Sequence, residues 1–360
     1  MMKLSLCMIV KDDMRIIDTL ACARALGIDE ICVVLDEGYD PRIEQALSEI
    51  ESKVLIRPLD DDFAAQRNAS FEMATGDWIL WLDSDDTISM AKQHMEFWKK
   101  MMRDEPVFMG DRPRLSDNDV VMLPYWYAHE DDKPTILLWR ERLMRREIGW
   151  TWKYPIHEVC QTTSPDTRTR LVMLDIPVIH HRDHAVGERN LRITERYMND
   201  YISEGRFQFY AGNEYSSQKN IPKAIECYER VLEHDEWHEH RSIAAHRLGA
   251  LWAMQKEPNK AREYCAMSML IDPMRLEPFI LLGDIARQCG VNDEALHWYT
   301  IAANMKLVTR LLPQDPRLPG IARMNADKLI PKRNPVKGEA EMLFDGSPAA
   351  REHEVEVKMT

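Results

Sequence analysis

The sequence contains no apolar run of about 18 residues, the length that an α-helix needs to cross a bilayer. Its first residues, MMKLSLCMIVKDD, hold only a short apolar run before the next charge, which predicts that they are not a secretory signal peptide. The seven cysteines form no CxxC pair and are scattered among apolar segments, so neither a disulfide framework nor a zinc site is expected. These absences favour a cytoplasmic protein with reduced thiols.

An excess of positive charge is also missing, because the formal net charge is -13 at pH 7. Nucleic acids and anionic membranes are bound by clustered Lys and Arg, so a broad surface for either partner is not expected. The 360 residues are 45% hydrophobic and 30% charged, as in an ordinary globular protein. A chain of this length can form two domains that each bury a core.

Strand-like and helix-like segments alternate through the first part of the chain. Strands are predicted at 4–10, 30–36, 53–59 and 77–83, and helices over 13–27, from Pro41 onward and over 64–75. Alternation at this interval implies crossover connections and a parallel sheet that is covered by helices on both faces. Ligands of such sheets bind beyond the carboxyl ends of the strands.

The fourth predicted strand ends in an unusual acidic cluster. The segment GDWILWLDSDD, residues 76–86, passes from buried apolar residues to Asp83, Ser84, Asp85 and Asp86. Asp is a poor strand former and like charges repel, so local stability does not explain the cluster. Mg²⁺ and Mn²⁺ prefer oxygen ligands and are often shared between carboxylates and phosphates. A cation held here would neutralise charge on a departing diphosphate.

Small and aromatic residues recur at fixed intervals in the second part of the chain. Gly212, Gly249 and Gly283 are 37 and 34 residues apart, and the same intervals separate Ala224, Ala261 and Ala295 and also Tyr228, Cys265 and Tyr299. Small residues at fixed offsets allow two antiparallel helices to approach closely. The pattern predicts three stacked helical hairpins of the tetratricopeptide type from about residue 205.

The ordered set LSLCMIVKDD, VVLDEG, DDFAAQRN and GDWILWLDSDD resembles a family 2 glycosyltransferase of GT-A fold. Downstream, GWTWKYPIHEV and IPVIHHRD, followed by the helical repeats, resemble the bacterial and phage branch that includes the peptide S-glycosyltransferases making glycocins. The resemblance covers roughly residues 4–310. It implies an α/β GT-A domain with a Rossmann-like mixed sheet, followed by an all-α domain of tetratricopeptide-like repeats.

Four segments are predicted from the pattern and the resemblance together. They are the GT-A domain at 1–185, a bridging helix at 186–205, the repeats at 206–310, and a Pro-rich and then charged tail at 311–360 that is partly mobile.

The resemblance assigns roles to individual residues. Those assigned to the nucleotide sugar are Val10, Lys11, Asp36, Arg67, Asp83 and Ser84. Among them, Arg67 would contact the base or diphosphate, and Asp83 the ribose. Asp85 would bind the Mn²⁺ or Mg²⁺ ion, with His180 as a further ligand; the adjacent His181 and the more distant His157 are alternatives to His180.

Glu158, in the segment PIHEV, is the candidate general base. An inverting transfer needs a carboxylate on the acceptor side to take the proton of the nucleophile. The expected function is therefore a metal-dependent, inverting transfer of a sugar from a nucleotide sugar, a UDP-sugar by preference, to an acceptor. The resemblance favours a peptide Cys, Ser or Thr, held by the repeats, which could also form a homo-oligomer.

Several alternatives stay open from the sequence. The acceptor could be a saccharide, a lipid-linked sugar or a modified phage DNA base. DSDDT, residues 83–87, also fits the D-x-D-x-T pattern of haloacid dehalogenase-like phosphatases, although there the motif ends the first strand of the domain. A third alternative is a non-catalytic scaffold in which the repeats accompany a degenerate transferase domain.

Overall fold

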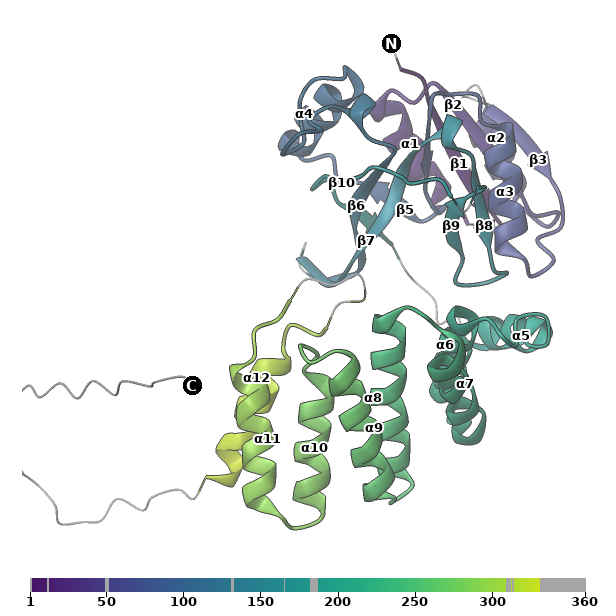
Figure 1. Cartoon of the computed structure of the whole chain (residues 1–360). Coiled ribbons are helices and arrows are strands. Elements are labelled where there is room, and N and C mark those ends of the chain that lie inside the picture. Colours follow the sequence, from purple (N-terminus) through teal and green to yellow (C-terminus); the bar gives the residue numbers. More distant parts are fainter. Residues whose placement is uncertain are drawn as a thin grey trace, which may run out of the picture.

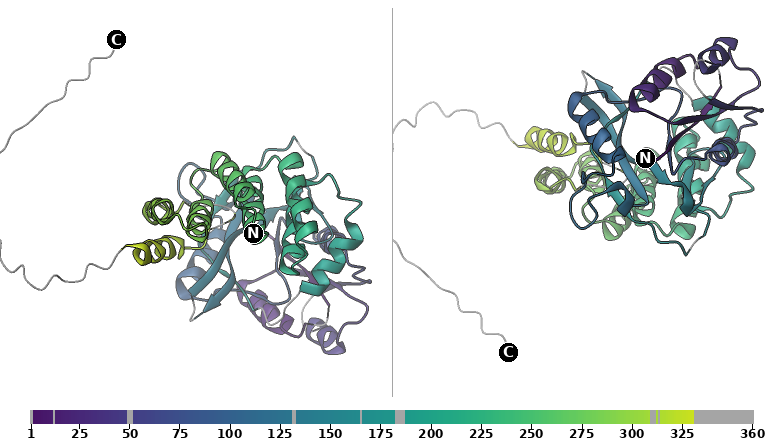
Figure 2. Two further views of the ribbon diagram at one scale, coloured as in Figure 1. Left: turned by 90° about the horizontal axis from the view of Figure 1, so that it is seen from below. Right: turned by 90° about the horizontal axis from the view of Figure 1, so that it is seen from above.

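The computed structural model describes residues 2–11, 13–48, 52–130, 133–164, 166–181, 187–308, 312 and 314–330. A domain built around one large sheet lies on one side of the molecule, and an array of helices lies on the other (Figure 1). Figure 2 shows the helical array in front when the molecule is seen from below, and the sheet domain in front when it is seen from above.

The first part of the sheet domain alternates strands and helices as predicted. The elements are β1 (Leu4–Val10), α1 (Ile16–Leu26), β2 (Glu30–Leu35), α2 (Pro41–Ser48), β3 (Ser52–Ile56), α3 (Phe63–Met73) and β4 (Trp78–Trp81). β1 lies between β2 and β4 and is parallel to both. Helix α1 ends where Gly27 adopts a left-handed conformation, with φ 73°, which costs glycine little.

The second part of the sheet departs from the all-parallel sheet that the alternation predicted. Its elements are β5 (Asp86–Ile88), α4 (Lys92–Met102), β6 (Val120–Glu130), β7 (Lys133–Arg145), β10 (Leu171–Met173) and β11 (Val178–His180), and a separate two-stranded sheet pairs β8 (Trp150–Lys153) with β9 (Val159–Thr162). The strand order is β3-β2-β1-β4-β7-β6-β11-β5, with β10 paired to β6.

Strand β7 runs antiparallel to both β4 and β6. The direction reverses because β6 and β7 form a hairpin, and a hairpin needs no crossover helix. The result is the mixed sheet of the GT-A resemblance.

The centre of the sheet is buried on both faces. In β1, Leu4, Leu6 and Met8 pack in one cluster with α1, whereas Cys7 faces a second cluster that includes Phe71 of α3. Because successive side chains of a strand point to opposite faces, a strand covered on both sides is apolar throughout. This explains why LSLCMIV is apolar except for Ser5, which is buried and bonds to Glu30.

The predicted helical repeats are confirmed. Helix α5 (Gly187–Tyr197) precedes three hairpins, α6 (Gly205–Ser217) with α7 (Ile221–His234), α8 (His238–Met254) with α9 (Pro258–Ile271), and α10 (Glu277–Gln288) with α11 (Asn292–Asn304). They stand side by side in the array of Figure 1. A Cβ placed on Gly283 would lie 2.5 Å from the ring of Tyr299, and one on Gly212 would lie 2.6 Å from the ring of Tyr228. The repeated glycines therefore mark the points where paired helices meet.

Part of the segment 311–360 that was expected to be a tail is helical. Residues Leu318–Leu329 form α12, and its Ala322 and Ala326 are buried in one cluster with α11. The two alanines, four residues apart, give α12 a small apolar face that covers the last hairpin. Residues 331–360 lie outside the described residues. Within the part of the chain that is described, none of the helices combines the length and the apolar character needed to span a membrane.

Candidate active site

A cavity of about 630 Å³ lies at the carboxyl ends of β1, β2 and β4, against α5 and α6. Every residue that the resemblance assigned to a site lines it: Val10, Lys11, Asp36, Arg67, Asp83, Ser84, Asp85, Glu158 and His180. His157 lines it as well. Residues far apart in the sequence thus share one cavity, at the edge of the sheet where this architecture binds its ligands.

The acidic turn after β4 is held by helix α1. The Thr19 hydroxyl lies 3.0 Å from the carbonyl oxygen of Ser84 and 2.8 Å from that of Asp86, and can donate to either. The amide of Asp83 donates to Asp86 Oδ2 over 3.1 Å. The Ser84 hydroxyl is 3.3 Å from Asp13 Oδ2. These bonds set the directions in which Asp83 and Asp85 leave the turn.

Arg67 joins Asp83 to Glu158. Its Nη2 lies 2.7 Å from Asp83 Oδ1, and its Nε lies 3.1 Å from Glu158 Oε1. The guanidinium also packs over the rings of Trp81 and Trp152, at 4.7 and 5.1 Å from their centroids. Arg67 therefore bonds two carboxylates from distant segments, and holds the Asp83 and Glu158 side chains at the same cavity.

The positive charge of Arg67 lowers the pKa of Asp83. Burial raises the pKa of the Asp83 carboxyl, but the positive charges of Arg67 and Arg142 outweigh it and lower that pKa to about 2. Asp83 is consequently an anion over the whole physiological pH range. An ionised carboxylate is a strong hydrogen-bond acceptor for a hydroxyl group.

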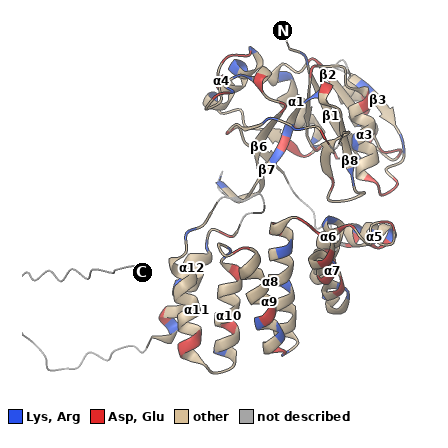
Figure 3. Ribbon diagram, in the orientation of Figure 1, with Lys and Arg blue, Asp and Glu red and all other residues tan. Residues whose placement is uncertain are grey.

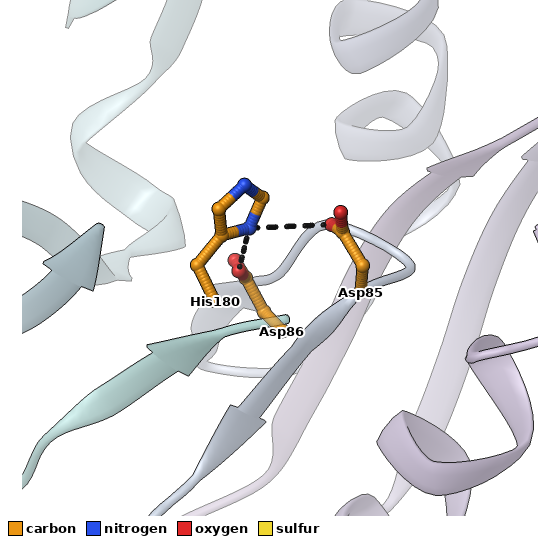
Figure 4. A group of neighbouring side chains, drawn as sticks. All are labelled: Asp85, Asp86 and His180. Atoms are coloured by element: carbon orange, nitrogen blue, oxygen red, sulfur yellow. Dashed lines mark hydrogen bonds and ion pairs between the residues drawn. The ribbon is translucent and has the colours of Figure 1, made fainter. Parts of the chain in front are cut away.

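Asp85, Asp86 and His180 form a group suited to a metal ion (Figure 4). One ligand atom from each residue lies within 4.8 Å of those of the other two. His180 Nδ1 is 3.1 Å from Asp86 Oδ1 and 3.5 Å from Asp85 Oδ1. Carboxylate oxygens together with one imidazole nitrogen are a donor set that Mn²⁺ accepts.

The electrostatics of this group also fit a cation. Burial, followed by repulsion from Asp83 and Asp86, raises the pKa of Asp85 to about 6, although His180 acts in the opposite direction. The pKa of His180 is raised as well, because its bond to Asp86 and the nearby carboxylates outweigh the effect of burial. A divalent ion would relieve the repulsion between the acidic groups. The positive charge of Arg15, whose Nη2 lies 3.4 Å from Asp85 Oδ2, also offsets part of this repulsion.

Asp86 and Arg142 are site residues that the sequence analysis did not assign. Both side chains are fully buried, and Arg142 Nη2 lies 3.0 Å from Asp86 Oδ2. Arg142 comes from β7, and its guanidinium lies over the rings of Trp81 and Tyr125. RERLMRR gives no sign that its second arginine would be the buried one, so only the position of β7 in the sheet reveals this pair.

The other assigned residues line the cavity at the ends of β1 and β2. Asp36 Oδ1 accepts hydrogen bonds from the amides of Leu59, at 2.8 Å, and Glu37, at 3.1 Å. The amide of Asp36 donates to the Val10 carbonyl over 2.9 Å, and Lys11 follows as an exposed side chain. Neither of the two alternatives to His180 is in the Asp85–Asp86–His180 group: His157 bonds to Glu214, and His181 contacts Thr87.

Positive charge gathers at this cavity although the protein as a whole is acidic. Its lining includes the basic residues Lys11, Arg15, Arg67, Arg140, Arg142, Arg189 and Arg206, against the acidic residues Asp13, Asp36, Asp83, Asp85 and Glu158. Elsewhere, basic and acidic residues are found on both domains (Figure 3). A cavity richer in cationic than in anionic groups favours an anionic ligand.

Comparison with known proteins bears on the first domain. Residues 15–164 match the family model described as Glycosyl transferase family 2. The match favours the transferase over the phosphatase interpretation of DSDDT.

The chain is also similar to a TPR repeat-containing protein of Synechococcus elongatus, with 26% identity over 205 residues. The alignment covers 55% of this chain and 46% of the relative, so the chain spans less than half the length of that curated protein.

Two solved structures are similar to part of the chain. The crystal structure of MamA has a TM-score of 0.27 at 17% identity, covering 32% of this chain and 75% of MamA. The first TPR of Spaghetti (RPAP3), bound to an HSP90 peptide, has a TM-score of 0.29 at 16% identity, covering 35% of this chain and 95% of that one.

Proposed function

We propose that this chain is a metal-dependent, inverting glycosyltransferase that moves a sugar from a nucleotide sugar, in preference a UDP-sugar, to an acceptor nucleophile. The family 2 domain supports the reaction class. The observation that carries the proposal is the convergence of Asp83, the Asp85–Asp86–His180 group and Glu158 on one cavity. A degenerate transferase domain would have no need to keep such a set of charged side chains at one cavity.

Asp85 and His180 are the residues that would hold Mn²⁺ or Mg²⁺, with Asp86 behind them as a third oxygen donor or as the partner that orients His180. When bound, the ion neutralises charge that develops on the leaving diphosphate. The fully buried Arg142 balances the charge of Asp86 and keeps its carboxylate in place. The imidazole of His180 is oriented by the contact of its Nδ1 with Asp86.

Glu158 acts as the general base in this proposal. Arg67 bonds Oε1 of Glu158, and we assign Oε2 to the acceptor's proton. A positioned base of this kind contributes roughly 10²–10⁴-fold to turnover. Because Arg67 also bonds Asp83, the base would be aligned with the part of the site that binds the ribose.

The nucleotide would occupy the carboxyl ends of β1, β2 and β4. Val10, Lys11 and Asp36 line the end that we assign to the base, and Asp83 and Ser84 the ribose and phosphates. Arg67 then acts on the nucleotide mainly through Asp83, since its guanidinium already bonds two carboxylates.

The acceptor that we favour is a peptide carrying Cys, Ser or Thr, because the helical hairpins form a stacked array of the kind that binds extended peptides. A saccharide or lipid-linked acceptor is the alternative, and a homo-oligomer through the repeats is a second use of the same array. The domain bounds that we propose are 1–185 for the GT-A domain, 186–205 for the bridging segment and 206–310 for the repeats. Of the segment 311–360, α12 packs against the last hairpin.

The test is donor hydrolysis by the purified chain. A panel of UDP- and GDP-sugars is incubated with Mn²⁺, and release of the nucleotide is measured. Slow hydrolysis of one UDP-sugar, lost when Mn²⁺ is chelated, is the expected result. Asp85→Asn should lower UDP affinity in the presence of Mn²⁺ at least about tenfold by calorimetry, since one charge-bearing ligand is lost.

The control is Asp200→Asn, a matched change at an exposed position before α6, which should leave the affinity as it was. The scaffold alternative predicts that the protein binds no nucleotide and that Asp85→Asn has no effect on nucleotide affinity or donor hydrolysis.

A further inference from the structure

The loop that presents Glu158 lies between the two domains. It spans residues 154–158 and joins β8 to β9. Glu158 and His157 both line the cavity, but their side chains have partners in different domains. Glu158 bonds Arg67 of α3, and His157 bonds Glu214 of α6.

The backbone of this loop is strained. Tyr154 has φ 71° and His157 has φ 54°, both in the left-handed region that bulky side chains rarely adopt. Such conformations cost free energy and persist only where the surroundings impose them. Two of them within four residues indicate that contacts from outside the loop hold its shape.

The helical domain supplies those contacts at the start of the loop. The Tyr154 hydroxyl donates to Glu204 Oε2 over 2.9 Å, and its ring packs against Tyr201 and Phe207. Ile156 is buried in the same cluster. The first half of the loop is therefore embedded in the segment that leads into α6.

His157, the residue next to Glu158, is held from three directions by α6. Its Nε2 lies 3.1 Å from Glu214 Oε1 and donates to that carboxylate. Its ring stacks on Tyr210 with centroids 4.3 Å apart and planes 13° apart. Arg206 Nη2 donates to the His157 carbonyl over 3.3 Å. That carbonyl belongs to the peptide unit that leads into Glu158.

We propose that α6, the first helix of the repeats, contributes to the active site. Its Tyr210 and Glu214 are positioning residues that orient Glu158 through His157. This inference rests on the proposed function, and on Glu158 as its base. It implies that the helical domain controls turnover directly, besides any part it takes in binding the acceptor.

Simple packing between domains would predict a different behaviour. Packing alone stabilises the interface, and its loss would lower the melting temperature or nucleotide affinity whatever residue stands at 158. Positioning predicts a loss of turnover that depends on the Glu158 carboxylate. Displacing a reacting group by about 1 Å can lower a rate by about a hundredfold.

The experiment measures UDP-sugar hydrolysis with Mn²⁺, using the donor found in the panel above and the full chain. Glu214→Ala removes the acceptor of the His157 hydrogen bond, whereas Glu214→Gln keeps an oxygen in its place. We expect kcat to fall about tenfold to a hundredfold in Glu214→Ala and to recover in Glu214→Gln, with little change in the Kd of UDP. Tyr210→Leu is a second, independent variant for which the same fall is expected.

The double variant Glu158→Gln/Glu214→Ala decides between the two explanations. If Glu214 acts through Glu158, the double variant should be no slower than Glu158→Gln alone, because the two changes remove one function. Glu226→Ala, on α7 and away from the cavity, is the matched control and should hydrolyse the donor at the original rate.

Three outcomes would overturn the inference. Full activity in both Glu214→Ala and Tyr210→Leu would disprove the positioning role of α6 and leave the proposed function intact. Losses that multiply in the double variant would assign α6 to packing alone. No nucleotide binding or hydrolysis by the unsubstituted protein would reject the proposed function, and this inference with it.

Discussion

The candidate active site and the close helix contacts of the repeats are packed in different ways. At the cavity, charged side chains are buried together, and Asp86 and Arg142 are fully buried as a pair. Where paired helices of the repeats meet, a glycine lies against a tyrosine ring. The repeats also bury charge, as in the Arg275–Asp272 pair. These helix contacts depend on close packing, whereas the cavity gathers buried charges, which stabilise a fold poorly but suit the binding of an ion or an anion.

Two histidines show the same contrast. His180 and His240 are both close to an aspartate, at 3.1 Å from Asp86 and 2.7 Å from Asp235. The pKa of His180 is raised, because several carboxylates together outweigh its burial. The pKa of His240 is lowered, because burial, together with the positive charge of Arg206, outweighs the carboxylates of Asp235 and Glu239. The balance between burial and all the surrounding charges, rather than the presence of one partner, decides the direction.

The largest effect is expected at the cavity, where Glu158→Gln should lower kcat of transfer or hydrolysis by about 10²–10⁴-fold. The amide keeps the shape of the side chain and cannot take a proton. Steady-state kinetics with Mn²⁺ and the donor measure it, and UDP affinity should change much less than kcat. An unaltered kcat would show that Glu158 is not the base. The catalytic role that distinguishes the cavity from the repeats would then lose its main support.

The buried ion pair gives the second largest effect. Arg142→Met leaves Asp86 without its buried cation and should destabilise the sheet domain by about 3–5 kcal/mol in urea unfolding. The comparison is Arg230→Met, which removes the Arg230–Glu226 pair on the surface of α7 and should cost about 0.5 kcal/mol or less. Equal losses in the two variants would contradict the view that burial separates these pairs.

A smaller effect is expected where the repeats pack most tightly. Gly283→Ala would bring a methyl group within 2.5 Å of the Tyr299 ring and should destabilise the protein by about 1–3 kcal/mol. Gly249→Ala should be milder, since its nearest atoms, at 3.1 Å, are the Cys265 sulfur and a carbonyl oxygen.

The control for these changes is Gly320→Ala in α12, where nothing lies within 4 Å of the added carbon. It should be neutral or stabilising by up to about 1 kcal/mol, as for alanine in an open helical position. Thermal unfolding ranks the three variants, and a loss at position 320 as large as that at 283 would argue against close packing as the cause.

The smallest effect is a dependence on pH. Because the pKa of His240 is lower in the folded protein than in the unfolded chain, its contribution is fully present above the unfolded value of about 6.5 and is lost as the pH falls below it. His240→Gln should therefore flatten the decline in melting temperature between pH 7 and pH 5. The matched change His238→Gln, at an exposed position of the same helix, should keep the original slope.

The elements that could be predicted from the sequence are those with a local pattern. The strands and helices up to β4, and the three hairpins with their close-approach glycines, follow from periodicities that each segment carries by itself. The mixed direction of the sheet followed only from the resemblance and not from any local pattern, and the helix α12 was not predicted. Both depend on which distant segment an element packs against.

The candidate site divides in the same way. The sequence by itself determined which chemistry-bearing residues the chain has and that Asp83 and Asp85 end a strand, because strand ends are marked by local hydrophobicity. Only the tertiary structure decided that Arg67 joins Asp83 to Glu158, that Asp86 is buried against Arg142, and that α6 holds His157. These contacts join residues from different elements across the sheet and between the domains, and their distances are set by packing rather than by any spacing along the chain.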